Sequence, residues 1–170
     1  ISFLFLVPSS MLSSVSALGA QNFGAGKPER AVETLKYAIM IAVGFGLTVA
    51  VVIQFAADPV VSLFTDNGTV IHSGGQYLRG YIWDCVFAGI HFSFSGYFCA
   101  CQKSGLSFLH NITAIVLVRV PGVYLMSKLF SDTLYFMGLA TAAGSLLSVI
   151  ICVIAFTILL KKERENKAFR

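Results

Sequence analysis

YAIMIAVGFGLTVAVVIQFAA, residues 37–57, decides the fold class of this chain. The stretch contains no charged residue, and as an α-helix rising 1.5 Å per residue it would cross the roughly 30 Å hydrocarbon core of a bilayer. Four further apolar stretches of similar length occupy residues 1–23, 81–101, 106–127 and 134–160. Because lipid offers no partner to an open strand edge, all five stretches are expected to be helical. The sequence therefore predicts an all-α, polytopic membrane protein with five transmembrane helices.

The composition of the whole chain supports this class. Of its 170 residues, 56% are hydrophobic and only 12% are charged, against about 25% charged residues in an average soluble domain. So few charges cannot cover a soluble domain, which excludes an ordinary soluble enzyme, a disordered tail and a basic nucleic-acid-binding domain. The four cysteines lie in apolar stretches without the spacing of a zinc site, and we interpret them as packing residues.

Basic residues predict the orientation in the membrane. If successive connections alternate between the two sides, nine of the 12 lysines and arginines fall on one side and two on the other. The nine are Lys27, Arg30, Lys36, Lys103, Lys161, Lys162, Arg164, Lys167 and Arg170, and the two are Arg79 and Lys128. The positive-inside rule then places the connection 24–36 and the tail 163–170 in the cytoplasm, and the long connection 58–80 outside. The first helix would start outside, which leads us to expect that earlier spans are missing.

The third apolar stretch has faces of different character. A polar stripe at helical spacing contains Tyr81, Asp84, His91, Ser95 and Gln102. A second face contains the small residues Gly89, Ser93, Gly96 and Ala100, a spacing that lets a neighbouring helix approach closely. Ionisable residues inside a membrane are costly, so the stripe is a candidate wall of a substrate or cation cavity. The alternative is that the small side chains of the stripe, Ala88, Ser95 and Cys99, serve packing alone, against which stand the ionisable Asp84 and His91.

Arg119 is the twelfth basic residue and lies inside the fourth span. Matching depths across the hairpin of the third and fourth spans places Arg119 near His91, with Asp84 about 7 Å further out. Arg119 therefore either pairs with an acceptor of the cavity or extends toward the membrane surface, and both alternatives stay open. His72 and His110, near the ends of their spans, are expected to be interfacial.

Two prolines predict irregular helices. Pro121 leaves the carbonyl of Leu117 without its helical partner, and Pro8 precedes a run of serines in the first span, so both are expected to kink their helices. Small residues at 3-4-3-4 spacing in the fifth span predict a packing seam, formed by Gly138, Thr141, Ser145, Ser148 and Cys152. No Ser/His/Asp set, carboxylate pair or metal cluster predicts catalysis, and no cofactor is expected.

Three strings resemble the multidrug and toxic compound extrusion (MATE) transporters: SALGAQNFGAGKPERA (16–31), LFTDNGTVIHSGGQYLRGY (63–81) and VLVRVPGVYLMS (116–127). Their order and spacing resemble helices eight to twelve of that family, so residues 1–162 would form most of the C-terminal lobe of a twelve-helix, two-lobed transporter. The chain would then be a fragment that needs the N-terminal lobe of the same protein.

The resemblance implies an antiporter of the cell membrane that exports organic cations or other drug-like compounds by alternating access, driven by sodium or proton entry. Within the family pattern, the acidic position midway along the tenth helix aligns with Ala88, so the family's cation-site role does not carry over directly to Asp84. Two alternatives stay open: a lipid-linked saccharide flippase of the same superfamily, which a groove lined by several arginines or lysines would favour, and a non-transport multi-span membrane protein.

Overall fold

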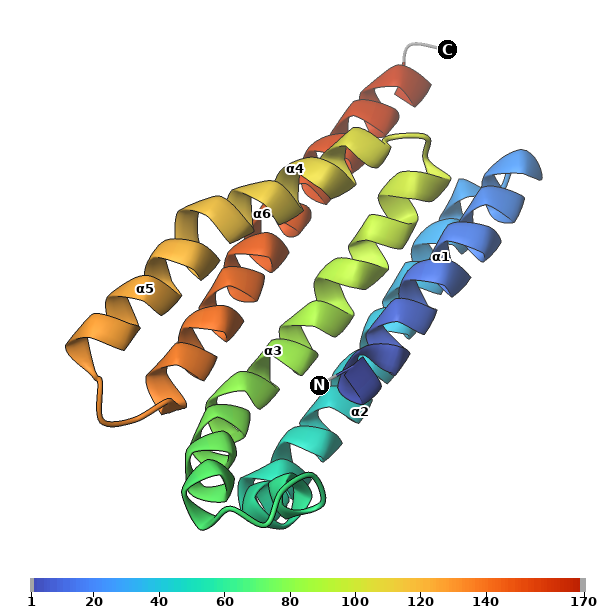
Figure 1. The fold of residues 1–170 in the computed structure, drawn as a ribbon. Helices are drawn as coiled ribbons and strands as arrows, with labels where there is room; N and C mark the ends of the chain where they lie inside the picture. The colour runs from blue at the N-terminus through green and yellow to red at the C-terminus, as the bar shows by residue number, and fades with distance from the viewer. Residues whose placement is uncertain (1, 169–170) are drawn as a thin grey trace.

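The computed structural model describes residues 2–168, with side chains from residue 4 to residue 162. Over this range the chain is a bundle of long helices (Figure 1). In chain order the elements are the short 3-10 helix η1 (Ser2–Phe5), α1 (Leu6–Gly24), α2 (Pro28–Ser62), α3 (Gly68–Ala100), α4 (Ser104–Ala114), the π-helical segment η2 (Ile115–Arg119), α5 (Val120–Leu129) and α6 (Tyr135–Ala168). The all-α prediction is confirmed.

A glycine turn joins α1 to α2. Gly26 has φ +69°, and the amide of Lys27 donates to the carbonyl of Asn22 at 2.9 Å, which closes the end of α1. Pro28 then takes the first position of α2, where its missing N–H is not needed. The helix then runs without a break from Pro28 into the apolar stretch 37–57.

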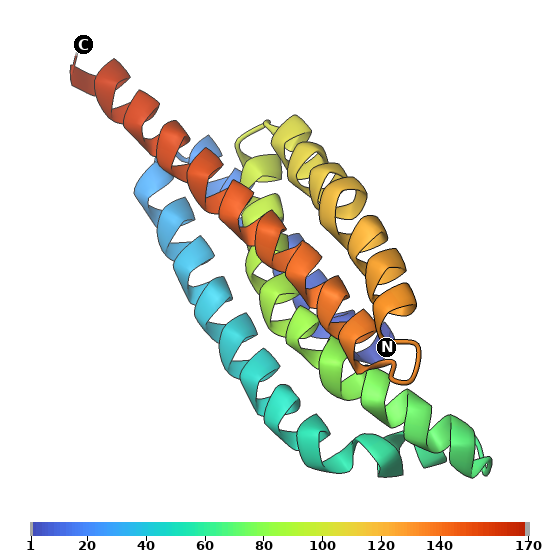
Figure 2. The same cartoon turned by 90° about the vertical axis from the view of Figure 1, so that its left-hand side faces the viewer.

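The connection between α2 and α3 is much shorter than predicted. The expected loop 58–80 is wrong, because α2 continues to Ser62 and α3 already begins at Gly68. The side-chain oxygen of Asn67 accepts hydrogen bonds from the amides of Thr69 (3.0 Å) and Val70 (3.3 Å) and caps α3. Figure 2 shows α2 bending near this end, where Pro59 interrupts its hydrogen bonds.

Helix α3 is the centre of the bundle. It packs against α1 and α2 on one side and against α6 and α4 on the other (Figures 1 and 2). The small-residue face makes the closest approaches: a Cβ on Gly89 would lie 2.8 Å from the Cβ of Ala42 in α2, and one on Gly96 would lie 2.5 Å from the carbonyl oxygen of Leu12 in α1. The predicted packing face of α3 is therefore confirmed.

Residues 104–129 form one helical rod with an irregular centre. The π-helical segment η2 ends at Arg119, two residues before Pro121, and this wider turn accommodates the hydrogen bond that the proline cannot make. Pro8 behaves differently from the prediction of a kink. It lies in the first turn of α1, directly after the 3-10 turn η1, where a proline is tolerated without breaking the helix.

Within the described residues, three helical segments are long and apolar enough to cross a membrane: Pro28–Ser62, Ser104–Leu129 and Tyr135–Lys162. The α1 helix is less apolar because of its serines, and α3 carries charged residues, so a membrane crossing by all five stretches stays a prediction. The α1–α2 and α3–α4 connections and the end of α6 lie at one end of the bundle, with the other two connections at the opposite end (Figure 1). The orientation predicted from the basic residues assumes that successive connections alternate between two sides, and the connections alternate in this way between the two ends of the bundle.

Candidate functional site

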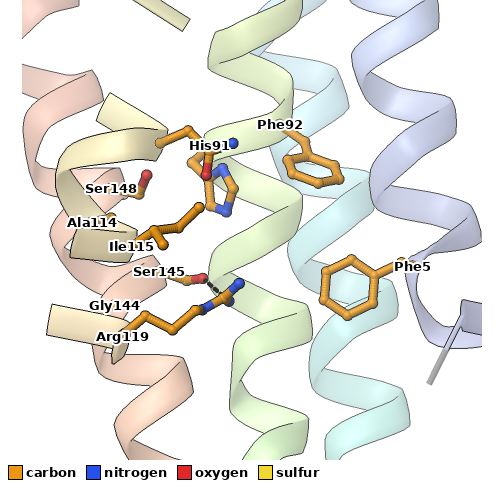
Figure 3. Close-up of a pocket in the computed structure, with 10 residues that line it drawn as sticks. Phe5, His91, Phe92, Ala114, Ile115, Arg119, Gly144, Ser145 and Ser148 are labelled. Atoms are coloured by element: carbon orange, nitrogen blue, oxygen red, sulfur yellow. Dashed lines mark hydrogen bonds between the residues drawn. The ribbon is translucent and has the colours of Figure 1, made fainter. Parts of the chain in front are cut away.

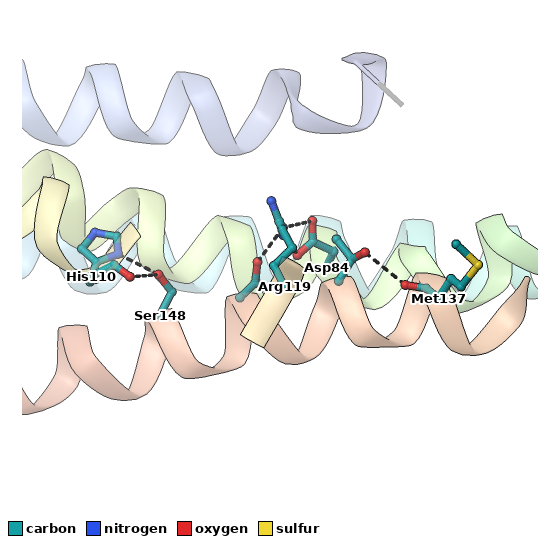
Figure 4. A network of polar contacts seen from close by, with 7 residues as sticks. Asp84, His110, Arg119, Met137 and Ser148 are labelled. Atoms are coloured by element: carbon teal, nitrogen blue, oxygen red, sulfur yellow. Dashed lines mark hydrogen bonds and ion pairs between the residues drawn. The ribbon is translucent and has the colours of Figure 1, made fainter. Parts of the chain in front are cut away.

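The site is centred on a buried ion pair. The carboxylate of Asp84 in α3 is fully buried, and both of its oxygens accept from Nη2 of Arg119, each at 3.0 Å (Figure 4). The same nitrogen lies 3.2 Å from the hydroxyl of Ser145 in α6. Three elements thus meet at one guanidinium, and the pairing that depth matching left open is made.

The π-helical segment positions Arg119. Its guanidinium lies between α3 and α6, and Gly144 of α6 provides the space, because a Cβ there would approach the Cβ of Arg119 to 3.1 Å. A buried carboxylate without a partner costs several kcal/mol. The pair with Arg119 therefore fixes how the rod 104–129 docks against α3.

A second polar contact lies further along the same groove. His110 of α4 is 1% exposed, with Nε2 2.8 Å from the hydroxyl of Ser95 and Nδ1 2.7 Å from the hydroxyl of Ser148. The prediction that His110 is interfacial is therefore wrong. Depth matching could have found this contact, because the hairpin places His110 opposite residue 98, one turn from Ser95.

A cavity of about 180 Å³ lies between the ion pair and this histidine. Figure 3 shows the imidazole of His91 on the side of the cavity that faces Arg119, with Phe5 and Phe92 on another wall. The remaining lining residues are Asn111, Ala114, Ile115, Gly144, Ser145 and Ser148. His91 is 5% exposed, and its Nδ1 atom is buried without a hydrogen-bond partner among the described residues.

The predicted site residues separate into groups. Arg119 and His91 line the cavity. Asp84 lies outside the lining and holds Arg119 in place through the ion pair. Tyr81 is buried one turn from Asp84 and stacks on Tyr77 with ring centroids 5.5 Å apart, outside the cavity lining. Ser95 is used by His110.

Gln102 does not belong to the site. It lies exposed in the α3–α4 turn with φ +59°, at the end of the bundle, so the idea that the polar stripe lines one continuous cavity is wrong at this residue. Helical spacing places Gln102 on the stripe, but α3 ends at Ala100, so that spacing no longer applies at residue 102.

The seam on α6 is both packed and polar. Its close approach to α3 is confirmed at Gly138, where a Cβ would lie 2.5 Å from the carbonyl oxygen of Tyr77. Ser145 and Ser148, predicted only as packing residues, also bind Arg119 and His110. Their hydroxyls lie one turn apart, at the spacing that presents both to the same groove.

Comparison with known proteins gives the family. The MatE family model matches residues 1–125, which is most of the chain. The chain belongs to the MatE family. Over 122 residues it is 28% identical to a protein of Shewanella oneidensis (strain MR-1) named FAD transporter, an alignment that covers 71% of this chain and 26% of that protein. The chain thus spans about a quarter of that relative's length, and no solved structure matches it.

Family membership gives the charged groove a setting. The MatE family and the name of the Shewanella relative both point to transport. Among the described residues, no cluster of three or more histidine, cysteine or acidic side chains is arranged to hold a metal ion. What the groove offers chemically is a buried carboxylate paired with an arginine and a small polar cavity.

Proposed function

We propose that this chain forms part of an antiporter that exports organic cations or other drug-like compounds across the cell membrane, driven by sodium or proton entry. The observation that carries the proposal is the fully buried Asp84 paired with Arg119 inside a MatE-family bundle. A buried ion pair gains little stability over apolar residues of similar volume, so its presence there supports a role in transport.

The ion pair suggests how binding and coupling are linked. A sodium ion, a proton or a cationic substrate that reaches Asp84 has to replace the bonds donated by Nη2 of Arg119. Arg119 then acts as a tethered cation that occupies the carboxylate while nothing else does. Because only one positive partner is needed at a time, ion and substrate exclude each other, which is the basic requirement of antiport.

The remainder of the proposal concerns the setting. The C-terminal end of α6 is cytoplasmic, and the opposing N-terminal lobe supplies the other half of the transport path. Alternating access requires two lobes that rock about a site between them. The bilayer covers the outward faces of α2, η2, α5 and α6, where large apolar side chains are exposed, including Met40, Phe55, Leu117, Tyr124 and Ile158.

A second candidate is export of a flavin nucleotide. The name of the Shewanella relative, FAD transporter, favours it. A flavin nucleotide is anionic, so it would not compete for Asp84 as an organic cation does, and the two candidates predict different substrates in the same assay.

The test is transport by the intact protein reconstituted in liposomes. Vesicles loaded with ethidium or with FAD are given an inward sodium or proton gradient, and release is followed by fluorescence. We expect gradient-dependent ethidium export, abolished by Asp84→Asn at unchanged protein content. Asp58→Asn is the matched control, because Asp58 also pairs with an arginine, Arg79 at 3.0 Å, but at the end of the bundle. Export of FAD alone would establish the second candidate, and no gradient-dependent release of either compound would overturn both.

A further inference from the structure

The cavity beside Arg119 has the features of a ligand site. It lies between α3, the rod 104–129, α6 and Phe5, is open at the rim near Asn111, and has a volume of about 180 Å³. An engineered apolar cavity of about 150 Å³ admits a benzene molecule. The space beside Arg119 therefore accommodates a single six-membered ring.

Several hydrogen-bonding groups in the cavity wall have no hydrogen-bond partner among the described residues. Arg119 uses only Nη2 for Asp84 and Ser145, which leaves the Nε and Nη1 donors without partners among the described residues. The imidazole of His91 makes no hydrogen bond with any described residue, although His91 is only 5% exposed. Asn111 adds an amide at the rim. A buried group such as Nδ1 of His91 is normally satisfied, so its partner is expected to come from a ligand or from water. The side chain of Arg119 is 35% exposed and Asn111 is exposed, so their donors are free to bind the same ligand.

The charge of the wall indicates a neutral ligand. The positive charge of Arg119 is already balanced by Asp84 at 3.0 Å, on the side away from the cavity. A full anion would enter without a counter-charge of its own and would lose part of its hydration, which costs more than the entry of a neutral acceptor. Arginine donors without a net charge to neutralise favour carbonyl oxygens.

The shape of the wall indicates a flat ligand. Phe5 and Phe92 lie with ring centroids 6.2 Å apart and form one wall, and Ala114, Ile115 and Gly144 contribute apolar surface near the donors. Aromatic rings contact a planar partner favourably by offset or edge-on packing.

We propose that this cavity binds a neutral six-membered ring that carries carbonyl oxygens, of the pyrimidine-dione class. Arg119 donates to a ring carbonyl, His91 faces a ring N–H, and the two phenylalanines contact the ring. The inference deepens the transport function proposed above and rests on it: the ring is the part of a transported compound that this lobe holds.

Uracil tests the chemistry directly. The intact protein in detergent is titrated with uracil, with benzoate and with toluene, and binding is followed by saturation-transfer NMR on the small molecule. We expect uracil to bind and the other two to bind at least tenfold more weakly. Benzoate binding more tightly than uracil would overturn the neutral-ligand argument, and uracil binding no more tightly than toluene would mean that the cavity holds only water.

Variants locate the binding. Ala114→Leu places three more carbon atoms in the cavity and should weaken uracil binding at least tenfold, whereas Ala20→Leu, the same change at an exposed site on α1, should leave it unchanged. Asn111→Leu is a second variant at an exposed rim position, chosen to fold normally, and should weaken binding several-fold. Unchanged uracil binding in folded Ala114→Leu and Asn111→Leu would overturn the assignment. Gradient-driven export by the unmodified protein without uracil binding would contradict this inference alone. Absence of gradient-driven export by the unmodified protein would contradict the proposed transport function.

Discussion

Asp84 is the one fully buried acidic side chain among the described residues 4–162, and its surroundings determine what substitution does to it. Both of its oxygens accept from one nitrogen of Arg119, which is its charged partner and whose own side chain is 35% exposed. The two partners are therefore unequal, because Arg119 can reach water or the cavity when the pair is broken and Asp84 cannot.

This asymmetry gives a prediction for the ion pair. Arg119→Gln leaves a buried charge without a partner and should destabilise the protein by about 3–5 kcal/mol, whereas Asp84→Asn should cost less. The double variant should recover a large part of the loss, since it removes both charges. The measurement is folded protein after heating, by fluorescence-detected size-exclusion chromatography. Additive losses in the double variant would show that the pair contributes no coupling.

His110 gives a second prediction at this scale. His110→Ala removes the imidazole that binds two buried hydroxyls. The hydroxyl of Ser95 is orphaned, at a cost of about 1–3 kcal/mol, whereas the hydroxyl of Ser148 keeps its bond to the backbone oxygen of residue 110. The matched control is His72→Ala, which removes an exposed histidine from α3 and should change stability by less than about 0.5 kcal/mol. Equal thermal midpoints of the two variants would mean that the buried hydroxyls find other partners.

Sequence reasoning reached these residues unevenly. Asp84 and Arg119 were identifiable because a charge inside a membrane is expensive wherever it lies. Their pairing was not predictable, because depth along a helix is readable from residue counts but direction around it changes at a π turn. His110 was assigned from its distance to the end of a span alone, and that distance says nothing about which helix it faces.

At the scale of elements, α3 organises the bundle through its glycines. Gly96 lies against the backbone of α1, and Gly89 lies against Ala42 of α2. Gly44, on the exposed side of α2, has no atom within 4 Å of the position its Cβ would take. The chain thus contains a packed and an open helical glycine for direct comparison.

Alanine should have opposite effects at these two glycines. Gly96→Ala forces α1 and α3 apart and should destabilise the protein by about 1–3 kcal/mol. Gly44→Ala gains about 0.8–1 kcal/mol of helix propensity without a clash and should be neutral or stabilising. Thermal midpoints of both variants in one detergent provide the comparison, and a Gly96→Ala variant as stable as Gly44→Ala would show that α1 is not held against this face.

The helices themselves were predictable, and the connections were less so. Long apolar stretches identified each helical region, and Asn67, Gly26 and Pro28 marked true boundaries. The stretch around Arg79 was assigned to a loop because it is polar. In the structure it belongs to α3, where Nε of Arg79 donates to the backbone oxygen of Gln54 and Nη2 pairs with Asp58. Polar side chains that bond to a neighbouring helix allow a helix to continue beyond its apolar stretch.

At the scale of the whole molecule, the orientation is the testable property. Single cysteines at Glu29 and Lys162, exposed at one end of the bundle, and at Asp66, exposed at the other, are introduced into a cysteine-free background. Asp66 is preferred to Asn67, whose side chain caps α3.

An impermeant thiol reagent applied to whole cells should label Asp66→Cys and leave Glu29→Cys and Lys162→Cys unlabelled until the membrane is permeabilised. The physical reason is the concentration of lysine and arginine at the Glu29 and Lys162 end. Labelling in the opposite pattern would reverse the orientation, and labelling of all three positions in intact cells would contradict a membrane crossing by these helices.

The π-helical segment η2 determines how far one half of the rod 104–129 is rotated relative to the other half. A π turn holds about one residue more than an α turn, so the two halves of the rod are offset by roughly 100° of rotation relative to an unbroken α-helix. One half is fastened by His110 to its serines, and the other carries Arg119 to Asp84. If the extra residue moved along the rod while His110 stayed fastened, Arg119 would swing about a quarter-turn away from Asp84. The position of the π turn along the rod would thus determine whether Arg119 reaches the carboxylate of Asp84.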